Sequence, residues 1–122
     1  MLFSSQFTAS CDDDTKDVLY QNNCYFLDGS AASCVKGSLA DQDLLSNIAS
    51  SFVGKNYKTA QSNNCCIYSS SFATKGMEWG FNSPQCNAAG PFTIAPVMGG
   101  AGCDGDTFSP NSAQLTFCFY TP

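Results

Sequence analysis

The placement of its cysteines constrains this chain more than any other feature. Eight cysteines are spread through 122 residues, and two of them are adjacent. The set consists of Cys11, Cys24, Cys34, Cys65, Cys66, Cys86, Cys103 and Cys118. An even number of cysteines in a small chain is typical of a disulfide framework, which persists outside the reducing cytosol. We therefore expect all eight to form disulfides and the protein to be secreted.

The adjacent cysteines also limit how the bridges are arranged. Successive side chains on a strand point to opposite faces, so Cys65 and Cys66 are expected to reach different partners on two sides of the domain. The short step from Cys11 to Cys24 favours a local N-terminal bridge, and the remaining pairings stay open. A zinc site is the alternative interpretation of grouped cysteines, but the chain has no Cys-x-x-Cys pair.

The length and composition of the chain limit the class of protein to which it can belong. The length suits one domain with a real core, which we place at residues 11–122 after an N-terminal extension at 1–10. With a net charge of −5, five lysines and no arginine, the chain lacks the basic surface that binds nucleic acid. No apolar run is long enough to span a membrane. Because there is no histidine, Ser-His-Asp and Cys-His catalytic sites are excluded.

One segment has clear helical periodicity. Over residues 41–53 the apolar side chains fall on one stripe, formed by Leu44, Leu45, Ile48 and Phe52. Ser38 or Asp41 can cap the start of this helix, and Gly54 can end it. The segment is therefore expected to be the principal helix.

The other ordered segments read as strands and turns. Residues 18–27 are rich in aromatic and apolar residues, and residues 92–95 alternate apolar with small or polar side chains. The clearest alternation covers residues 114–120, with Leu115, Phe117 and Phe119 on one face and Thr116, Cys118 and Tyr120 on the other. The sequence predicts an α+β fold: a single disulfide-rich domain with one main helix packed on an antiparallel β-sheet.

Acidic residues suggest a metal site. Asp104 and Asp106 flank a glycine in a Gly-rich segment, and carboxylate and carbonyl oxygens are the ligands that Ca²⁺ prefers. A second acidic group comprises residues 12–14 together with Asp17. The alternative is that both groups form solvated turns. We expect no cofactor, and the alternative is a bound calcium ion, with Asp104 and Asp106 as the better ligand pair.

Aromatic residues beside polar ones suggest a sugar-binding surface. Trp79, Tyr57 and Tyr68 lie near turn signals, where an exposed ring could stack on the apolar face of a sugar. The alternative is that these rings are core residues. A glycoside hydrolase would need two carboxylates, and Glu78 with an aspartate could provide them.

The N-terminal pattern Cys11…Cys24-Tyr25-Phe26 resembles the opening of C-type lectin-like domains, in which a local bridge precedes Cys-Tyr-aromatic. Cys86, Cys103 and Cys118 could stand for later cysteines of that family. The chain lacks the Glu-Pro-Asn and Trp-Asn-Asp motifs, so the family's sugar-binding and calcium-binding residues do not carry over. In size and cysteine density the chain is also similar to small cysteine-rich secreted proteins of fungi and other microbes.

The sequence therefore favours a secreted, non-enzymatic binding or surface protein. Its expected partner is an extracellular glycan or a wall or host protein. The first alternative is a structural subunit that assembles with copies of itself, because low charge and exposed apolar residues favour such packing. The second alternative is a small glycoside hydrolase.

Overall fold

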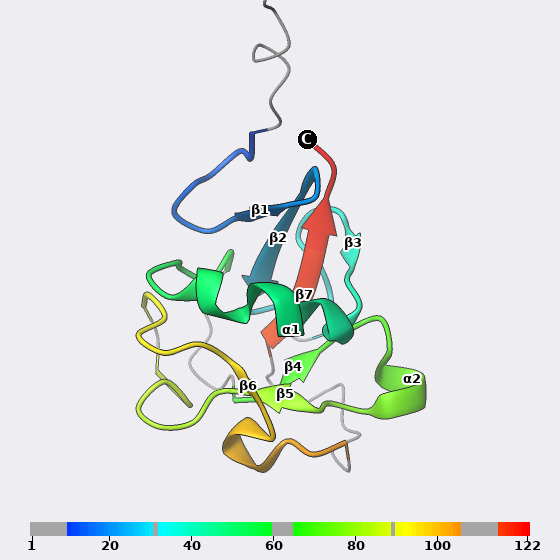
Figure 1. Ribbon diagram of the computed structural model, residues 1–122, viewed down its shortest axis with the longest axis vertical. Helices are drawn as coiled ribbons and strands as arrows, with labels where there is room; N and C mark the ends of the chain where they lie inside the picture. The colour runs from blue at the N-terminus through cyan, green and yellow to red at the C-terminus, as the bar shows by residue number, and fades with distance from the viewer. Residues whose placement is uncertain (1–9, 31, 60–64, 89, 106–114) are drawn as a thin grey trace, which may run out of the picture.

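The computed structural model describes residues 10–30, 32–59, 65–88, 90–105 and 115–122. It has one main helical segment and short strands in two sheets (Figure 1). The elements are β1 (Val18–Tyr20), β2 (Asn23–Asp28), β3 (Ser38–Leu39), η2 (Gln42–Leu44), α1 (Leu45–Ile48), η3 (Ala49–Phe52), β4 (Ile67–Tyr68), α2 (Phe72–Lys75), β5 (Trp79–Gly80), β6 (Val97–Met98), η4 (Gly100–Gly102) and β7 (Leu115–Tyr120). The fold is α+β and disulfide-rich, as predicted.

The main sheet is organised around β7, which lies near the C-terminus yet occupies the centre. β2 pairs along one side of β7, and β1 pairs with the outer side of β2. The other side of β7 is shared: β3 pairs with its last part and β4 with its first. These pairings are antiparallel except that of β4, which runs parallel to β7. The predicted antiparallel sheet therefore has one parallel strand, and a second, two-stranded sheet contains β5 and β6.

The principal helix lies where the sequence predicts it. The helical turns η2, α1 and η3 follow one another, with a departure from helical geometry at Ile48 (φ −125°). The side chain of Asp41 caps the start by accepting a hydrogen bond from Asp43 N at 2.9 Å. The helix ends at Val53, which is extended, and Gly54 follows at a φ of 89°. Full burial of a large apolar side chain stabilises a fold by about 1.5–3 kcal/mol. The buried side chains of this helix, Leu45, Ile48 and Phe52, therefore fasten it to the sheet.

The two faces of the main sheet are covered differently. On one face the helix packs over β2 and β7 (Figure 1), and alternate residues such as Leu27 and Phe117 join the main core. The opposite face carries a smaller buried cluster of Cys24, Phe26, Cys118 and Tyr120, against which Cys11 and Cys34 pack. The alternation predicted for β7 is confirmed. The second face is covered by disulfides and loops in the described part of the chain, with no helix over it.

All eight cysteines form disulfides, in the pairs Cys11–Cys24, Cys34–Cys118, Cys65–Cys86 and Cys66–Cys103. The predicted local N-terminal bridge is present, and the adjacent cysteines have different partners, as expected. They also lie where the two sheets meet, because Leu115 N donates to Cys66 O at 3.1 Å and Phe81 N donates to Cys65 O at 2.8 Å. This junction fixes the small β5–β6 sheet to β7.

Two of the expected strands differ in the structure. Residues 18–27 form a hairpin, because Gln21 and Asn22 both have positive φ, at 48° and 69°, and turn the chain between β1 and β2. Residues 92–95 form no strand. Phe92 is bonded instead to the loop that follows the helix, since its N–H donates to Lys55 O and its carbonyl accepts from Gly54 N. Tertiary contacts thus override the local alternation.

Candidate functional site

The rings predicted to stack on sugars are mostly buried. Trp79 is 7% exposed and Tyr57 is 4% exposed, and both belong to the main core. Tyr57 is fixed further by donating a hydrogen bond to Ala88 O at 2.7 Å and accepting one from Gln85 at 3.1 Å. Tyr68 is partly exposed, but its ring lies 4.7 Å from that of Phe72. The prediction of exposed platforms at Trp79 and Tyr57 is therefore wrong, and the alternative, that they are core residues, is correct.

The burial of Trp79 has one unusual feature. Its indole N–H has no hydrogen-bond partner among the described residues. A buried donor left without an acceptor costs about 1–3 kcal/mol. The apolar contacts of the ring with the core must therefore offset the cost of the unpaired indole N–H.

The predicted calcium ligands are only partly within the described residues. Asp104 is exposed and follows the disulfide-bonded Cys103, whereas Asp106 lies outside the described ranges. Within those ranges, no three ligating side chains are grouped closely enough to hold a metal. Calcium binding at this pair stays a prediction of the sequence.

Glu78 lies beside the start of the main helix. Its carboxylate accepts a hydrogen bond from the amide of the fully buried Gln42 at 2.9 Å, and Glu78 N donates to the same side chain at 3.3 Å. Nearby, the ammonium of Lys75 contacts the carboxylate of Asp43 at 2.8 Å. The hydrogen bond that Lys75 donates to Asp43, with further attraction from Asp43, Asp41 and Glu78, raises the pKa of Lys75. These three carboxylates and Lys75 form what we call the acidic margin.

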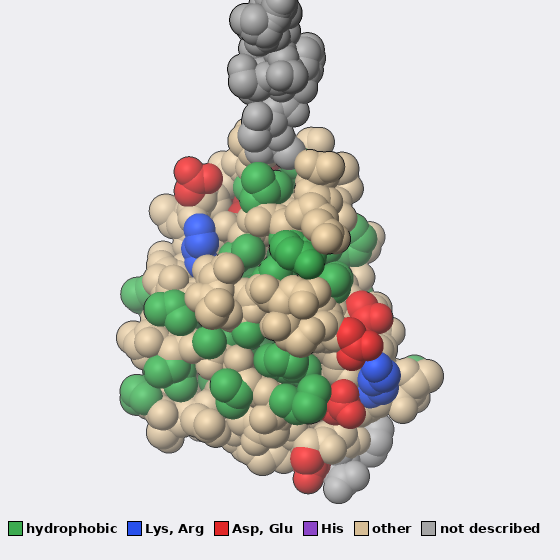
Figure 2. Space-filling view, viewed as in Figure 1, with side chains coloured by type: hydrophobic (Ala, Val, Ile, Leu, Met, Phe, Trp, Pro, Cys, Tyr) green, Lys and Arg blue, Asp and Glu red, His purple; other side chains and the backbone are tan. Residues whose placement is uncertain are grey.

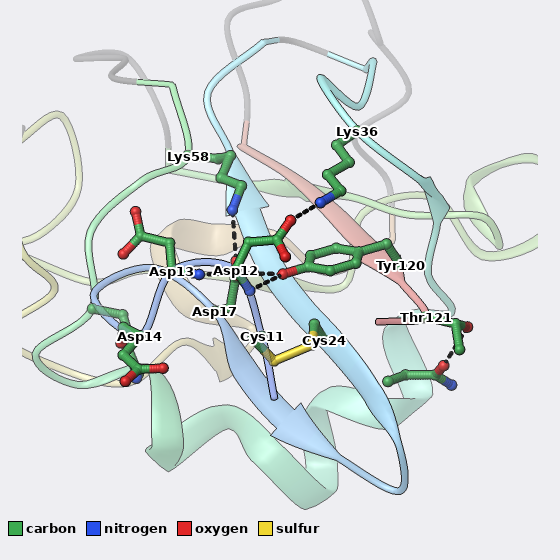
Figure 3. Close-up of a disulfide and its surroundings, with 12 residues drawn as sticks. Cys11, Asp12, Asp13, Asp14, Asp17, Cys24, Lys36, Lys58, Tyr120 and Thr121 are labelled. Atoms are coloured by element: carbon green, nitrogen blue, oxygen red, sulfur yellow. Dashed lines mark hydrogen bonds and ion pairs between the residues drawn. A yellow bond between two sulfur atoms is a disulfide. The ribbon is translucent and has the colours of Figure 1, made fainter. Parts of the chain in front are cut away.

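A second polar cluster was not recognised from the sequence. The hydroxyl of Tyr120 donates to the buried Asp17 at 2.6 Å and accepts a hydrogen bond from Asp12 N at 2.7 Å (Figure 3). The ammonium of Lys58 contacts the other oxygen of Asp17 at 2.8 Å. Burial first, and then the hydrogen bond to Asp17, raises the pKa of Tyr120. No local pattern could have indicated this cluster, because Tyr120 and Asp17 are 103 residues apart.

Exposed apolar side chains occur on the outer strand of the small sheet. In β6, Val97 is 41% exposed and Met98 is 63% exposed. Figure 2 shows apolar side chains spread over the face that carries α1 and β6, with acidic side chains gathered at one margin of it. We call Val97 and Met98 the β6 ridge. In the sequence, the ridge is a pair of apolar residues between Pro96 and Gly99. These two flanking residues limit the strand to a short length.

The described part of the chain contains no pocket. Within the same ranges, every helix falls short of the length and apolarity needed to cross a membrane. Comparisons with protein-family models, curated proteins and solved structures found no match to this chain. The resemblance to C-type lectin-like domains therefore stays a hypothesis that rests on the N-terminal residues. The four disulfides fit a small, stable extracellular protein.

Proposed function

We propose that this protein is secreted and acts by binding another protein through the β6 ridge. The observation that carries the proposal is the exposure of Met98, the most exposed large apolar side chain in the described residues. Such side chains, held on a rigid scaffold, are typical of protein contact surfaces. The small β5–β6 sheet is held in place because Cys66 is bridged to Cys103 and pairs with Gly80.

A protein is favoured over a glycan as the partner. Sugar rings stack best on flat aromatic faces, and Trp79 and Tyr57 are buried. The aliphatic side chains of the ridge instead suit the apolar groups of a protein. Glu78 directly precedes the first residue of β5. The acidic margin therefore lies next to the small sheet that carries the ridge. We therefore infer that the partner presents basic residues beside an apolar contact.

Self-assembly is the second candidate, since an outer strand can pair with a copy of itself. Gly99 N donates to Glu78 O, and Met98 lies directly opposite Trp79. By the alternation of an antiparallel ladder, the N–H and C=O of Met98 point away from β5. However, Pro96 has no N–H to offer, and Gly99 turns the chain at a φ of 79°. The free edge is too short to template a long assembly, so contact through side chains is favoured.

The test compares two exposed apolar residues. Wild type, Met98→Ser and Val35→Ser are applied to arrays of extracellular proteins and of glycans. Val35 is a matched control because it is 59% exposed and lies in a different segment, before β3. We expect wild type to bind a protein target, Met98→Ser to lose that binding, and Val35→Ser to keep it. Added salt should weaken the binding, because the acidic margin is exposed to solvent.

Three outcomes would contradict the proposal. Wild type that binds glycans alone would restore the sugar-binding hypothesis. Equal losses from Met98→Ser and Val35→Ser would show that the ridge has no special role. Light scattering that revealed a dimer at raised concentration, lost in Met98→Ser, would favour self-assembly instead.

A further inference from the structure

The residues before β1 form a strap over the second face of the sheet. This N-terminal strap, residues 11–17, is tied to β2 by the Cys11–Cys24 bridge. Its other attachments are mostly made by side chains, as Figure 3 shows beside that bridge. Among the described residues, the strap makes one backbone-to-backbone bond with the rest of the chain, in which Asn56 N donates to Thr15 O at 2.8 Å, and Asp12 N donates to the side-chain hydroxyl of Tyr120.

The strap is acidic, and it collects most of the positive charge of the chain. Of the five lysines, four contact it: Lys36 pairs with Asp12, Lys58 with Asp17 and Lys16 with Asp13, and Lys55 donates to Asp14 O. Three of these lysines lie outside the strap. In a chain of net charge −5, the strap therefore covers the one surface of the described residues where lysines gather.

The surface beneath the strap is aromatic as well as basic. The ammonium of Lys36 lies 3.8 Å from the centre of the Tyr120 ring, and that of Lys58 lies 4.9 Å from the centre of the Phe26 ring. Both rings belong to the smaller buried cluster. With the strap in place Tyr120 is only 7% exposed. The strap thus occupies its site as a bound acidic peptide would, with carboxylates on lysines and a backbone N–H on a tyrosine hydroxyl.

We propose that the strap is an autoinhibitory segment that occupies a binding surface for an acidic segment of another protein. The surface consists of Lys36, Lys55 and Tyr120, and it is freed when the Cys11–Cys24 bridge is opened. A dithiol reductant opens it: the two cysteines gain two electrons and two protons and become thiols, and the dithiol becomes a disulfide. An acidic peptide is the matching ligand because Tyr120 accepts a backbone N–H, which a simple anion lacks.

Local opening is compatible with the rest of the fold. The bridge closes a step of only 13 residues, and β1 begins directly after the strap at Val18. Asp17 is the last residue of the strap and can stay paired with Lys58 when residues 11–16 leave. The main core lies on the opposite face of the sheet and includes none of residues 11–16. Regions with few buried apolar contacts open at a lower cost than the whole fold.

The test uses the full chain with either of two bridges removed. Cys11→Ser with Cys24→Ser releases the strap, whereas Cys65→Ser with Cys86→Ser removes another local bridge away from it. Hydrogen exchange of residues 10–17 reports opening, and a labelled hexa-aspartate peptide is the binding probe. We expect fast exchange in the first variant alone, with binding of the probe stronger than in wild type by about tenfold or more. Lys36→Gln added to this variant should abolish the gain.

A second variant keeps the bridge and so guards against loss of folding. Tyr120→Phe retains the ring but removes the hydroxyl that binds Asp12 N and Asp17. It should speed exchange in the strap while the amides of β2 and β7 stay protected. The proposal is overturned if neither variant opens the strap, or if the strap opened by Cys11→Ser with Cys24→Ser leaves probe binding unchanged. It also fails if the Cys65–Cys86 variant gains the same binding, since any loosening of the chain would then suffice.

Discussion

Two aspartate–lysine pairs show how burial determines the contribution of an ion pair to stability. The ammonium to carboxylate distance is 2.8 Å in both Asp17–Lys58 and Asp43–Lys75. The side chain of Asp17 is fully buried, whereas that of Asp43 is 60% exposed. Breaking a buried pair leaves a charge without compensation, while an exposed pair is screened by water. The two ion pairs therefore contribute unequally to stability, although their distances are equal.

Asp17→Asn should lower the free energy of unfolding by about 3 kcal/mol or more, because it leaves Lys58 facing a neutral group. Asp43→Asn is the matched control and should cost less than about 1 kcal/mol. Urea denaturation at pH 7 measures both values. Similar losses in the two variants would show that the buried pair is weaker than its geometry implies.

The raised pKa of Tyr120 predicts a loss of stability at alkaline pH. An unfolded tyrosine ionises near pH 10, whereas burial and Asp17 keep Tyr120 protonated in the folded state. Above that pH the unfolded state holds fewer protons, so the free energy of unfolding falls as pH rises. The contribution is complete below about pH 10 and is lost through the interval up to the folded-state pKa.

Tyr120→Phe removes this contribution. Urea denaturation between about pH 8 and pH 11 should show the stability advantage of wild type over Tyr120→Phe shrinking as pH rises through the range where free tyrosine ionises. The lysines titrate in both proteins, so the difference between them isolates Tyr120. An advantage that is constant across this range would contradict the buried position of the hydroxyl.

Among the elements, β7 depends on a close approach by the loop that precedes β3. Gly37 has a φ of 74°, and a Cβ placed on it would lie 2.0 Å from the backbone oxygen of Phe119 in β7. Gly54, which ends the main helix, has a φ of 89° but open space around it. Both glycines relieve backbone strain, but only Gly37 also lets two segments meet.

Gly37→Ala should therefore lower the free energy of unfolding by about 3 kcal/mol or more, since it combines left-handed strain with a backbone clash. Gly54→Ala should cost only about 1–2 kcal/mol from strain. Thermal and urea unfolding give both values. Faster hydrogen exchange at β3 in Gly37→Ala would locate the damage, and equal costs for the two variants would argue against the close approach.

At the scale of the whole molecule, two of the four disulfides close the face of the sheet that lies opposite the helix. The face under the helix has an apolar core of its own, whereas the opposite face is closed by Cys11–Cys24 and Cys34–Cys118. These bridges span 13 and 84 residues. The longer one ties the loop before β3 to the central strand, so it restrains both the folded sheet and the unfolded chain.

Removing Cys34–Cys118 should destabilise the protein more than removing Cys11–Cys24. The chain-entropy model gives a difference of roughly 1.5 kcal/mol from loop length alone, and Cys118 is also fully buried. Calorimetry on the paired Cys→Ser variants measures the two melting temperatures. A greater loss from the Cys11–Cys24 variant would show that the strap supports the whole fold, which would also weaken its role as a removable segment.

Local patterns were sufficient for the helix, for the two faces of β7 and for the separate partners of Cys65 and Cys66. Each depends on a period of 3.6 or 2 residues, which neighbouring residues determine among themselves. The hairpin at Gln21 and Asn22 was missed because both residues adopt positive φ without a glycine to signal it. The position of the β6 ridge could not be predicted from the sequence, because it depends on how β6 pairs with β5.

The sequence by itself determined that eight cysteines would be paired and that one amphipathic helix would cover a sheet. Tertiary structure alone decided that Trp79 and Tyr57 are buried, because their exposure depends on segments distant in the chain. It also brought Asp17, Lys58 and Tyr120 together. Periodicity assigns a side chain to a face, but only long-range pairing determines which charges and rings meet there.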